Sequence, residues 1–148
     1  ALNIPVVSIT SLESLSLNVK SNFDYICSLI DARNNQVYAG VFDKSHFLQG
    51  NYLADDFNTI LDSLKIYPNI VFVGDGAELH KETISNIALD NLIHAKNVGI
   101  LAYNKYINGK IESADSILPL YLRKSQAERM KPSNEWCFNS KNAVGGFR

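Results

Sequence analysis

The sequence predicts an α/β domain in which an antiparallel group of strands is followed by alternating strands and helices. Two runs typical of strands stand on either side of a short turn that contains two asparagines, which is the pattern of a β-hairpin. Farther along, a short continuous apolar run precedes a helical pattern, as expected of a strand that is buried on both faces of a sheet. Together these observations favour a mixed sheet with helices packed on it.

The composition is that of one globular domain. The chain has 148 residues, of which 46% are hydrophobic and 20% charged, and this length is enough for a single core. The net charge of -1 gives no overall field that would attract nucleic acid or an anionic membrane. Contact with RNA through a local basic patch is kept as an alternative. Two cysteines and three histidines have no metal-ligand spacing, and Cys27 is expected to be a small buried side chain. Because no apolar run reaches the length of a membrane span and no signal peptide opens the chain, we expect a cytoplasmic protein.

The first helix is expected to begin after Thr10. Thr10 and Glu13 have the spacing of a capping box, in which each side chain binds the backbone amide of the other residue. The apolar positions that follow predict a helix of about three turns with one buried face. These positions are Leu12, Leu15 and Val19.

A hairpin and a third strand are expected next. Residues 23–31 and 37–43 are rich in aromatic and β-branched side chains, which favour strands. The chain must turn between them, and Asn34 and Asn35 suit a positive φ. Residues 47–53 are predicted to add a third antiparallel strand.

The second half alternates helices and strands. Asp55 and Asp56 are expected to cap a helix that ends before Pro68, and residues 70–73 are the doubly buried strand. The remaining predictions are a helix after 74–77, a weak strand at 92–95, a helix capped by Asn97 and ending near Asn108 and Gly109, an extended segment at 118–123 and a loose polar tail from Lys124.

Asp31 and Arg33 are marked because they stand where the first strand ends and the turn begins. The simplest interpretation is a hairpin tip, in which Asp31 accepts backbone amides and Arg33 is solvated or pairs with it. The alternative is a recognition surface. An acid–base site is the weakest interpretation, because no His, Cys or second carboxylate is close in sequence.

Gly74, Asp75 and Gly76 stand between a buried strand and an expected helix. Glycines there would let the backbone approach a ligand, and a helix N-terminus favours an anion, so a nucleotide site is one interpretation. A tight strand-to-helix turn explains the residues equally well, because the motif lacks the Lys-Ser/Thr of a P-loop and the full dinucleotide spacing. His80 and His94 are expected to be isolated, at the surface or half-buried.

The order of elements is that of one half of a ribonuclease-H-like fold, the unit from which actin-like ATPases are built. The motifs IPVVSITSLESLS, LIDARNNQVYAGVFD, VFVGDGA and ILPLYLRKSQAER resemble, in this order and spacing, the C-terminal part of the TsaB family, also called YeaZ. The resemblance runs from about Ile4 to Arg129. The hairpin matches at Asp31, Ala32, Arg33, Val37 and Tyr38, whereas Asn34, Asn35 and Gln36 replace the turn that is usual in the family, so no carboxylate role is inferred at position 36.

The resemblance implies a division of the chain. Residues 1–123 would be a C-terminal ribonuclease-H-like lobe, and residues 124–148 a polar, flexible tail. The lobe interface or structural motif would include Asp31, Arg33, Tyr38, Tyr121 and Arg123. The N-terminal lobe of the family, which opens with an Asp-Thr-Ser type strand and carries the helices that pair with TsaD, has no counterpart here. Since the chain begins at Ala1 and its only methionine is Met130, we expect a fragment or a processed or trimmed product, with a natural single-lobe protein as the alternative.

The function implied by the resemblance is that of a non-catalytic subunit. It would scaffold a TsaD-like transferase, which places a threonylcarbamoyl group on the adenosine beside the anticodon of tRNA. The implied partners are that transferase, a TsaE-like ATPase and a second copy of the chain, with tRNA reached through the complex, no membrane, and no resident cofactor or metal.

Two other functions are kept as alternatives. In the first, the chain is the nucleotide-binding half of an actin-like ATPase or kinase-type enzyme, and Gly74, Asp75 and Gly76 bind ATP only together with the absent lobe or a partner. The second and more remote one is a glycoprotease-like peptidase, for which the sequence offers neither a nucleophile–base pair nor a zinc set.

Overall fold

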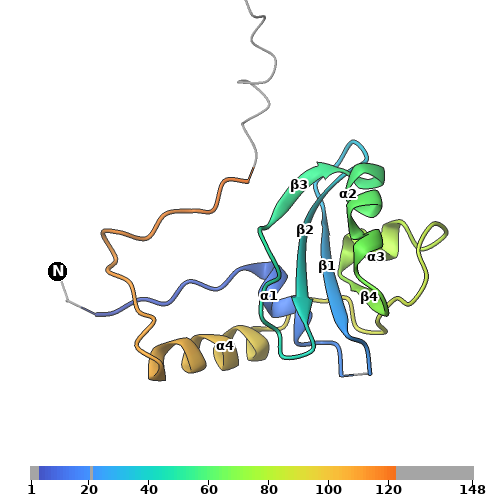
Figure 1. Cartoon of the computed structure of the whole chain (residues 1–148). Coiled ribbons are helices and arrows are strands. Elements are labelled where there is room, and N and C mark those ends of the chain that lie inside the picture. Colours follow the sequence, from blue (N-terminus) through green and yellow to red (C-terminus); the bar gives the residue numbers. More distant parts are fainter. Residues whose placement is uncertain (1–3, 21, 123–148) are drawn as a thin grey trace, which may run out of the picture.

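The computed structural model describes residues 4–20 and 22–122, and its centre is a four-stranded mixed sheet with strand order β3-β2-β1-β4 (Figure 1). The strands β1 (Tyr25–Asp31), β2 (Gln36–Asp43) and β3 (Leu53–Asp56) follow one another as an antiparallel meander. Strand β4 (Ile70–Val73) pairs parallel with β1. The predicted mixed sheet with its three-strand meander is therefore confirmed.

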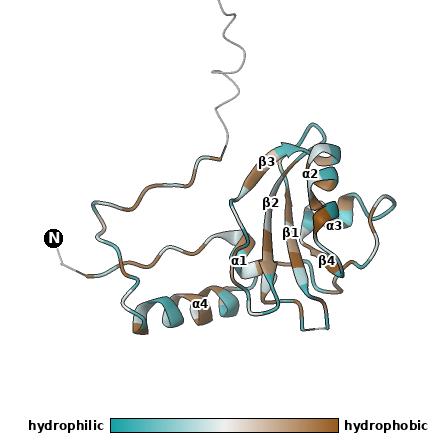
Figure 2. Cartoon of the chain, in the orientation of Figure 1, coloured by the Kyte–Doolittle hydropathy of each residue, from teal (hydrophilic) through white to brown (hydrophobic). Residues whose placement is uncertain are grey.

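Each face of the sheet carries its own apolar cluster, because side chains alternate between the two faces along a strand. One face packs under α2 (Phe57–Ser63) and α3 (Asp75–Leu79), and the other packs under α1 (Ser11–Ser16). In β4, Phe72 belongs to the first cluster and its two neighbours to the second, so this strand is buried on both faces as predicted. Figure 2 shows the hydrophobic residues along the central strands.

Cys27 is buried in the core, as expected. It belongs to the cluster under α2 and α3. Burial raises the pKa of its thiol far above the ordinary value, so the side chain stays neutral and acts as a small hydrophobic group.

The capping box at the start of α1 is confirmed. The Thr10 hydroxyl accepts the Glu13 amide at 3.1 Å, and the Glu13 carboxylate accepts the Thr10 amide at 2.8 Å. The predicted length is wrong, because α1 ends at Ser16 after 6 residues. After the helix the backbone continues in tighter turns, in which the amides of Asn18 and Val19 donate to the carbonyls of Leu15 and Ser16. The Val19 side chain is still buried in the core.

The third strand lies later in the chain than predicted. Between 47 and 50 the backbone folds back on the end of β2, and only an isolated bridge between Phe42 and Leu48 is formed. Asp43 causes this, because its carboxylate accepts the amides of Ser45 and Phe47 at 2.8 and 3.0 Å and so favours a turn. Regular pairing with β2 resumes only in β3.

Helix α2 begins where it was predicted. Asp56 is its N-cap and accepts the Asn58 amide at 2.9 Å. The helix passes into a 3₁₀ turn, η1 (Leu64–Ile66), and ends before Pro68.

The strand predicted at 92–95 is wrong. Leu92 and Ile93 are exposed, and α4 (Ala95–Ile107) begins directly after them with His94 as its N-cap. Asn97 is thus the third residue of the helix rather than its cap. A short bridge between Phe72 and Ile87 borders β4 instead.

The end of α4 agrees with the prediction, with Asn108 as C-cap and Gly109 at φ 71°. Residues 118–122 have no regular secondary structure. Arg123, the last residue of the predicted extended segment, and the predicted tail at 124–148 lie outside the described residues.

Candidate functional site

Asp31 forms the turn that the sequence predicted for it. It ends β1, and its carboxylate accepts the Arg33 amide at 2.8 Å. Asn34 and Asn35 have positive φ as expected, at 54° and 58°, and Arg33 shares this conformation at 62°. The carboxylate at the hairpin tip therefore holds the backbone in an unusual turn.

The structure brings the two marked motifs together. Asp75 accepts the amide of Asp31 at 3.1 Å and that of Gly76 at 2.8 Å through the same carboxylate oxygen. Since β1 and β4 are parallel neighbours, their carboxyl ends lie at the same edge of the sheet. This contact could not be predicted from the sequence, because the parallel register of these two strands was not predicted.

The glycines of this site permit a close approach between the turn and β1. A Cβ on Gly74, whose φ is 113°, would lie 2.1 Å from the Leu29 carbonyl oxygen, and one on Gly76 would lie 3.1 Å from the Leu29 carbonyl carbon. Gly74 donates its amide to Asn91 at 2.9 Å. The amides of both glycines thus already have partners within the chain, and α3 is only 5 residues long. The geometry is that of a tight strand-to-helix turn, and nucleotide binding at Gly74, Asp75 and Gly76 stays a prediction.

The other predicted positions lie elsewhere. Tyr38 is half-buried in β2 opposite Ile30, beside the cluster under α1. Tyr121 is exposed, and Figure 1 shows its segment, in orange, running apart from the sheet. The described residues therefore do not gather Tyr121 with Asp31 and Arg33, and Arg123 is outside them.

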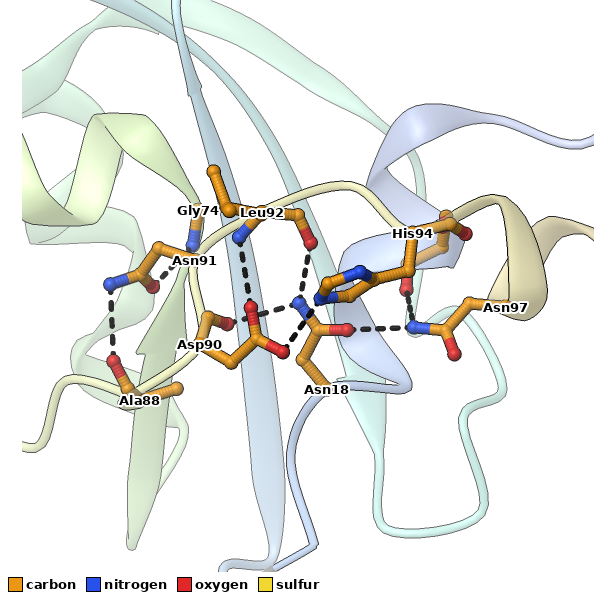
Figure 3. A network of polar contacts seen from close by, with 9 residues as sticks. Asn18, Gly74, Ala88, Asp90, Asn91, Leu92, His94 and Asn97 are labelled. Atoms are coloured by element: carbon orange, nitrogen blue, oxygen red, sulfur yellow. Dashed lines mark hydrogen bonds and ion pairs between the residues drawn. The ribbon is translucent and has the colours of Figure 1, made fainter.

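A network of asparagines that the sequence analysis did not anticipate ties three parts of the chain together (Figure 3). Asn18 donates to the carbonyls of Asp90 and Leu92 at 3.0 and 2.8 Å. Asn97 donates to the Ser14 carbonyl at 3.0 Å and to the Asn18 side-chain oxygen at 2.7 Å. These bonds join the end of α1, the loop before α4 and the first turn of α4. The asparagines show no regular spacing that would have revealed them in the sequence.

Neither of the two marked histidines is isolated. His94 lies 2.7 Å from an Asp90 carboxylate oxygen, and this hydrogen bond, with help from the Leu92 amide, holds the pKa of Asp90 below its usual range. The His80 ring stacks on Phe57 with ring centres 3.7 Å apart. The first contact lies within the loop that leads into α4, and the second joins the start of α2 to the end of α3.

The carboxylates of Asp31, Asp75 and Asp90 all accept hydrogen bonds from other groups of the same chain. Among residues 4–20 and 22–122, no group of three His, Cys, Asp or Glu side chains could hold a metal ion. In the same residues, no helix combines the length and hydropathy needed to cross a bilayer. Asp31 and Asp75 together fix the edge of the sheet where β1 and β4 end.

Comparisons with known proteins identify relatives over most of the chain. Residues 1–131 match the family model described as TsaD, tRNA N6-adenosine threonylcarbamoyltransferase. The chain is 27% identical over 142 residues to the tRNA threonylcarbamoyladenosine biosynthesis protein TsaB of Bacillus subtilis. This match includes 86% of the chain and 60% of the relative, so the chain spans about three fifths of that protein.

Two solved structures share the fold. YeaZ from Pseudomonas aeruginosa has a TM-score of 0.64 at 21% identity, covering 79% of this chain and 60% of that one. A protein described as similar to peptidase YeaZ from Pseudomonas aeruginosa has a TM-score of 0.66 at 22% identity, covering 80% of this chain and 59% of that one. The family model and the TsaB relative show that this chain belongs to the family that includes TsaD and TsaB (YeaZ), and the two solved structures share its fold.

Proposed function

We propose that the chain acts in tRNA threonylcarbamoyladenosine biosynthesis as a non-catalytic subunit that supports a TsaD-like transferase. The observation that carries the proposal is the match to TsaB over 86% of the chain. A ribonuclease-H-like lobe is part of the same proposal, supported by the mixed sheet and by the likeness to YeaZ. A cytoplasmic location, where tRNA is modified, also belongs to it.

The side chains of the candidate site support a structural rather than a catalytic role. Asp31 and Asp75 each use a carboxylate oxygen to hold backbone amides at 2.8–3.1 Å. A general acid or base needs a carboxyl group that reaches a substrate proton. In this arrangement the carboxylates fix the backbone, and the chemistry is left to the partner transferase.

Reconstitution with purified proteins tests the proposal. The protein that carries this chain is combined with the TsaD-like transferase and TsaE-like ATPase of the same organism, with tRNA and threonylcarbamoyl adenylate, and modified adenosine is measured by mass spectrometry of the nucleosides. We expect this protein to bind the transferase and to raise the yield at least tenfold, and to yield none on its own. Absence of binding and stimulation would contradict the supporting role, and transfer without the transferase would contradict the non-catalytic one.

The alternative function is nucleotide binding at Gly74, Asp75 and Gly76, and an experiment must distinguish it from the supporting role. The amides of both glycines are occupied by Asn91 and Asp75, which leaves them unable to bind a phosphate without rearrangement. Isothermal titration with ATP and magnesium distinguishes the two functions. Micromolar binding by the chain alone would favour the nucleotide-binding enzyme.

A further inference from the structure

Within the described residues, strand β3 forms an open edge of the sheet. It stands last in the order β3-β2-β1-β4 and pairs with β2 alone, and Figure 1 shows it at the outer side of the sheet. The opposite edge is covered, because the Phe72 amide of β4 donates to the Asn86 carbonyl at 2.9 Å and the Phe72 carbonyl accepts the Ala88 amide at 2.8 Å. An open edge is a template on which a further strand can pair.

The register of the ladder shows which backbone groups of β3 point outward. The Phe57 amide donates to the Asn35 carbonyl at 2.9 Å, and this bond continues the ladder between β2 and β3. Because bonding positions alternate along an antiparallel pair, Leu53 and Asp55 bond to β2, whereas Ala54 points its amide and carbonyl away from it. Elsewhere in the described part of the chain, no donor or acceptor bonds to these two groups of Ala54. An added strand can therefore bond to both.

A hollow lies beside this edge. Helix α2 follows β3 directly, and the two elements enclose a hollow of about 250 Å³. Small-molecule pockets are larger, at about 300–1,000 Å³, so the hollow suits a single side chain better than a free ligand. Leu53 packs on the cluster under α2, and the side chains of an added strand would alternate in the same way. The lining residues are Tyr52, Leu53, Ala54, Asp55, Thr59, Ile60 and Ser63.

The charge around the hollow is negative. Residues 52–63 contain the aspartates 55, 56 and 62 and no lysine, arginine or histidine. Asp62 pairs with Lys65 at 2.6 Å, and Asp56 accepts the Asn35 side chain at 2.8 Å. Asp55 is exposed and uses one carboxylate oxygen to accept the Asp56 amide at 2.7 Å. Its other oxygen has no partner among residues 4–20 and 22–122, so it is placed to bind a cation on a neighbouring strand.

We propose that β3 and α2 form a docking groove for an extended, basic segment of another protein, which adds a strand to the edge of the sheet. The segment bonds to the backbone of Ala54, places a lysine or arginine beside Asp55 and inserts an apolar side chain into the hollow. A second copy of β3 does not fit this groove, because it would bring the Asp55 carboxylates of the two copies together. The occupant is therefore a segment of a different chain.

Nuclear magnetic resonance of the ¹⁵N-labelled protein that carries this chain tests the proposal. The probe is the peptide Lys-Thr-Val-Thr-Lys, blocked at both ends, whose lysines and valine lie on one face of a strand in either direction. We expect the amide signals of Ala54 and Thr59 to shift, with a Kd of about 1 mM or lower. The peptide Glu-Thr-Val-Thr-Glu should bind at least threefold more weakly. The lysine peptide with both threonine nitrogens methylated should not bind, because it has no donor for the Ala54 carbonyl.

Variants of the protein separate the charge from the backbone contact. Asp55→Asn keeps an oxygen for the Asp56 amide but removes the charge, so it should weaken the lysine peptide at least threefold. Asp62→Asn is the matched control, because Asp62 is exposed on α2 and already paired, and it should leave binding unchanged. Ala54→Pro removes the outward amide without a loss of ladder bonds to β2 and should abolish binding. The spectrum of each free variant checks its fold.

Several outcomes would overturn the proposal. These are equal affinity for the lysine and glutamate peptides, shifts confined to residues outside β3 and α2, and unchanged binding by the folded Ala54→Pro protein. Absence of any shift at several millimolar lysine peptide would overturn it as well. Since the peptide titration requires neither the transferase nor tRNA, its failure is distinguishable from failure of the proposed function.

Discussion

Asp75 stabilises the edge of the sheet by binding two backbone amides with one carboxylate oxygen. One amide belongs to the turn after β4 and the other to Asp31 in β1, so a single side chain joins two neighbouring strands. Asp31 in turn holds the hairpin through Arg33. Each carboxylate was recognisable in the sequence as a turn residue, but their contact depends on the parallel pairing of β1 with β4, which only the folded chain shows.

Asp75→Ala should lower the free energy of unfolding by about 1–2 kcal/mol, because two amides lose their acceptor. Asp31→Ala should cost about 0.5–2 kcal/mol, by analogy with the loss of a polar cap. Urea denaturation measures both. Asp62→Ala is the control, since its ion pair with Lys65 is exposed on both sides and such pairs contribute little. Equal effects of Asp75→Ala and Asp62→Ala would show that Asp75 does not join the strands.

Gly74 and Gly109 form a matched pair of glycines with positive φ. At Gly74 a methyl group would lie 2.1 Å from the Leu29 carbonyl oxygen, whereas at Gly109 it would meet nothing within 4 Å. Gly74→Ala should therefore cost about 3 kcal/mol or more, from strain and overpacking together. Gly109→Ala should cost about 1 kcal/mol, from backbone strain alone. Thermal unfolding compares the two variants, and a Gly74→Ala protein as stable as Gly109→Ala would contradict the close approach of this turn to β1.

The hairpin turn and helix α2 are joined through Asp56. Its carboxylate accepts the Asn35 side chain at 2.8 Å and the Asn58 amide at 2.9 Å. The Phe57 amide also donates to the Asn35 carbonyl at 2.9 Å. The hydrogen bond from Asn35, followed by that from Asn58, holds the pKa of Asp56 below its ordinary value of 3.8.

This shift predicts a dependence of stability on pH. The folded chain has the lower pKa, so the contribution of the carboxylate is fully present above about pH 5 and is lost as the pH falls below 3.8 through the folded pKa. Asp56→Asn keeps a good N-cap but removes the titration. Urea denaturation at pH 7 and at pH 3 should show that the variant loses less stability than the natural chain. An equal loss in both proteins would mean that the Asp56 carboxylate has no linkage to folding.

The elements that were predicted correctly are those with strong local signals. The capping box at Thr10, the cap at Asp56 and the short run of β4 each depend on a few neighbouring residues. The third strand was misplaced because the Asp43 carboxylate holds a turn in a segment with the composition of a strand. The strand predicted at 92–95 was wrong because Leu92 and Ile93 are apolar but exposed, and burial cannot be read from composition alone.

The chain as a whole combines a sheet that was predicted with a helix, α4, whose existence was predicted but whose placement against the rest of the chain was not. The order of strands and helices indicated the mixed sheet, and the family motifs indicated TsaB, which the comparisons bear out. The asparagine network and the placement of α4 were not predictable, because they connect Asn18 and Ser14 with residues more than seventy positions away.

A role of this chain in tRNA modification is tested by the amount of threonylcarbamoyladenosine in tRNA from cells depleted of the protein that carries the chain. Nucleosides from total tRNA are quantified by mass spectrometry, with an unrelated tRNA modification as the internal control. We expect the modification to fall severalfold on depletion and to return when the protein is supplied again, while the control modification stays constant. An unchanged level of threonylcarbamoyladenosine in depleted cells would contradict a role of this chain in its biosynthesis.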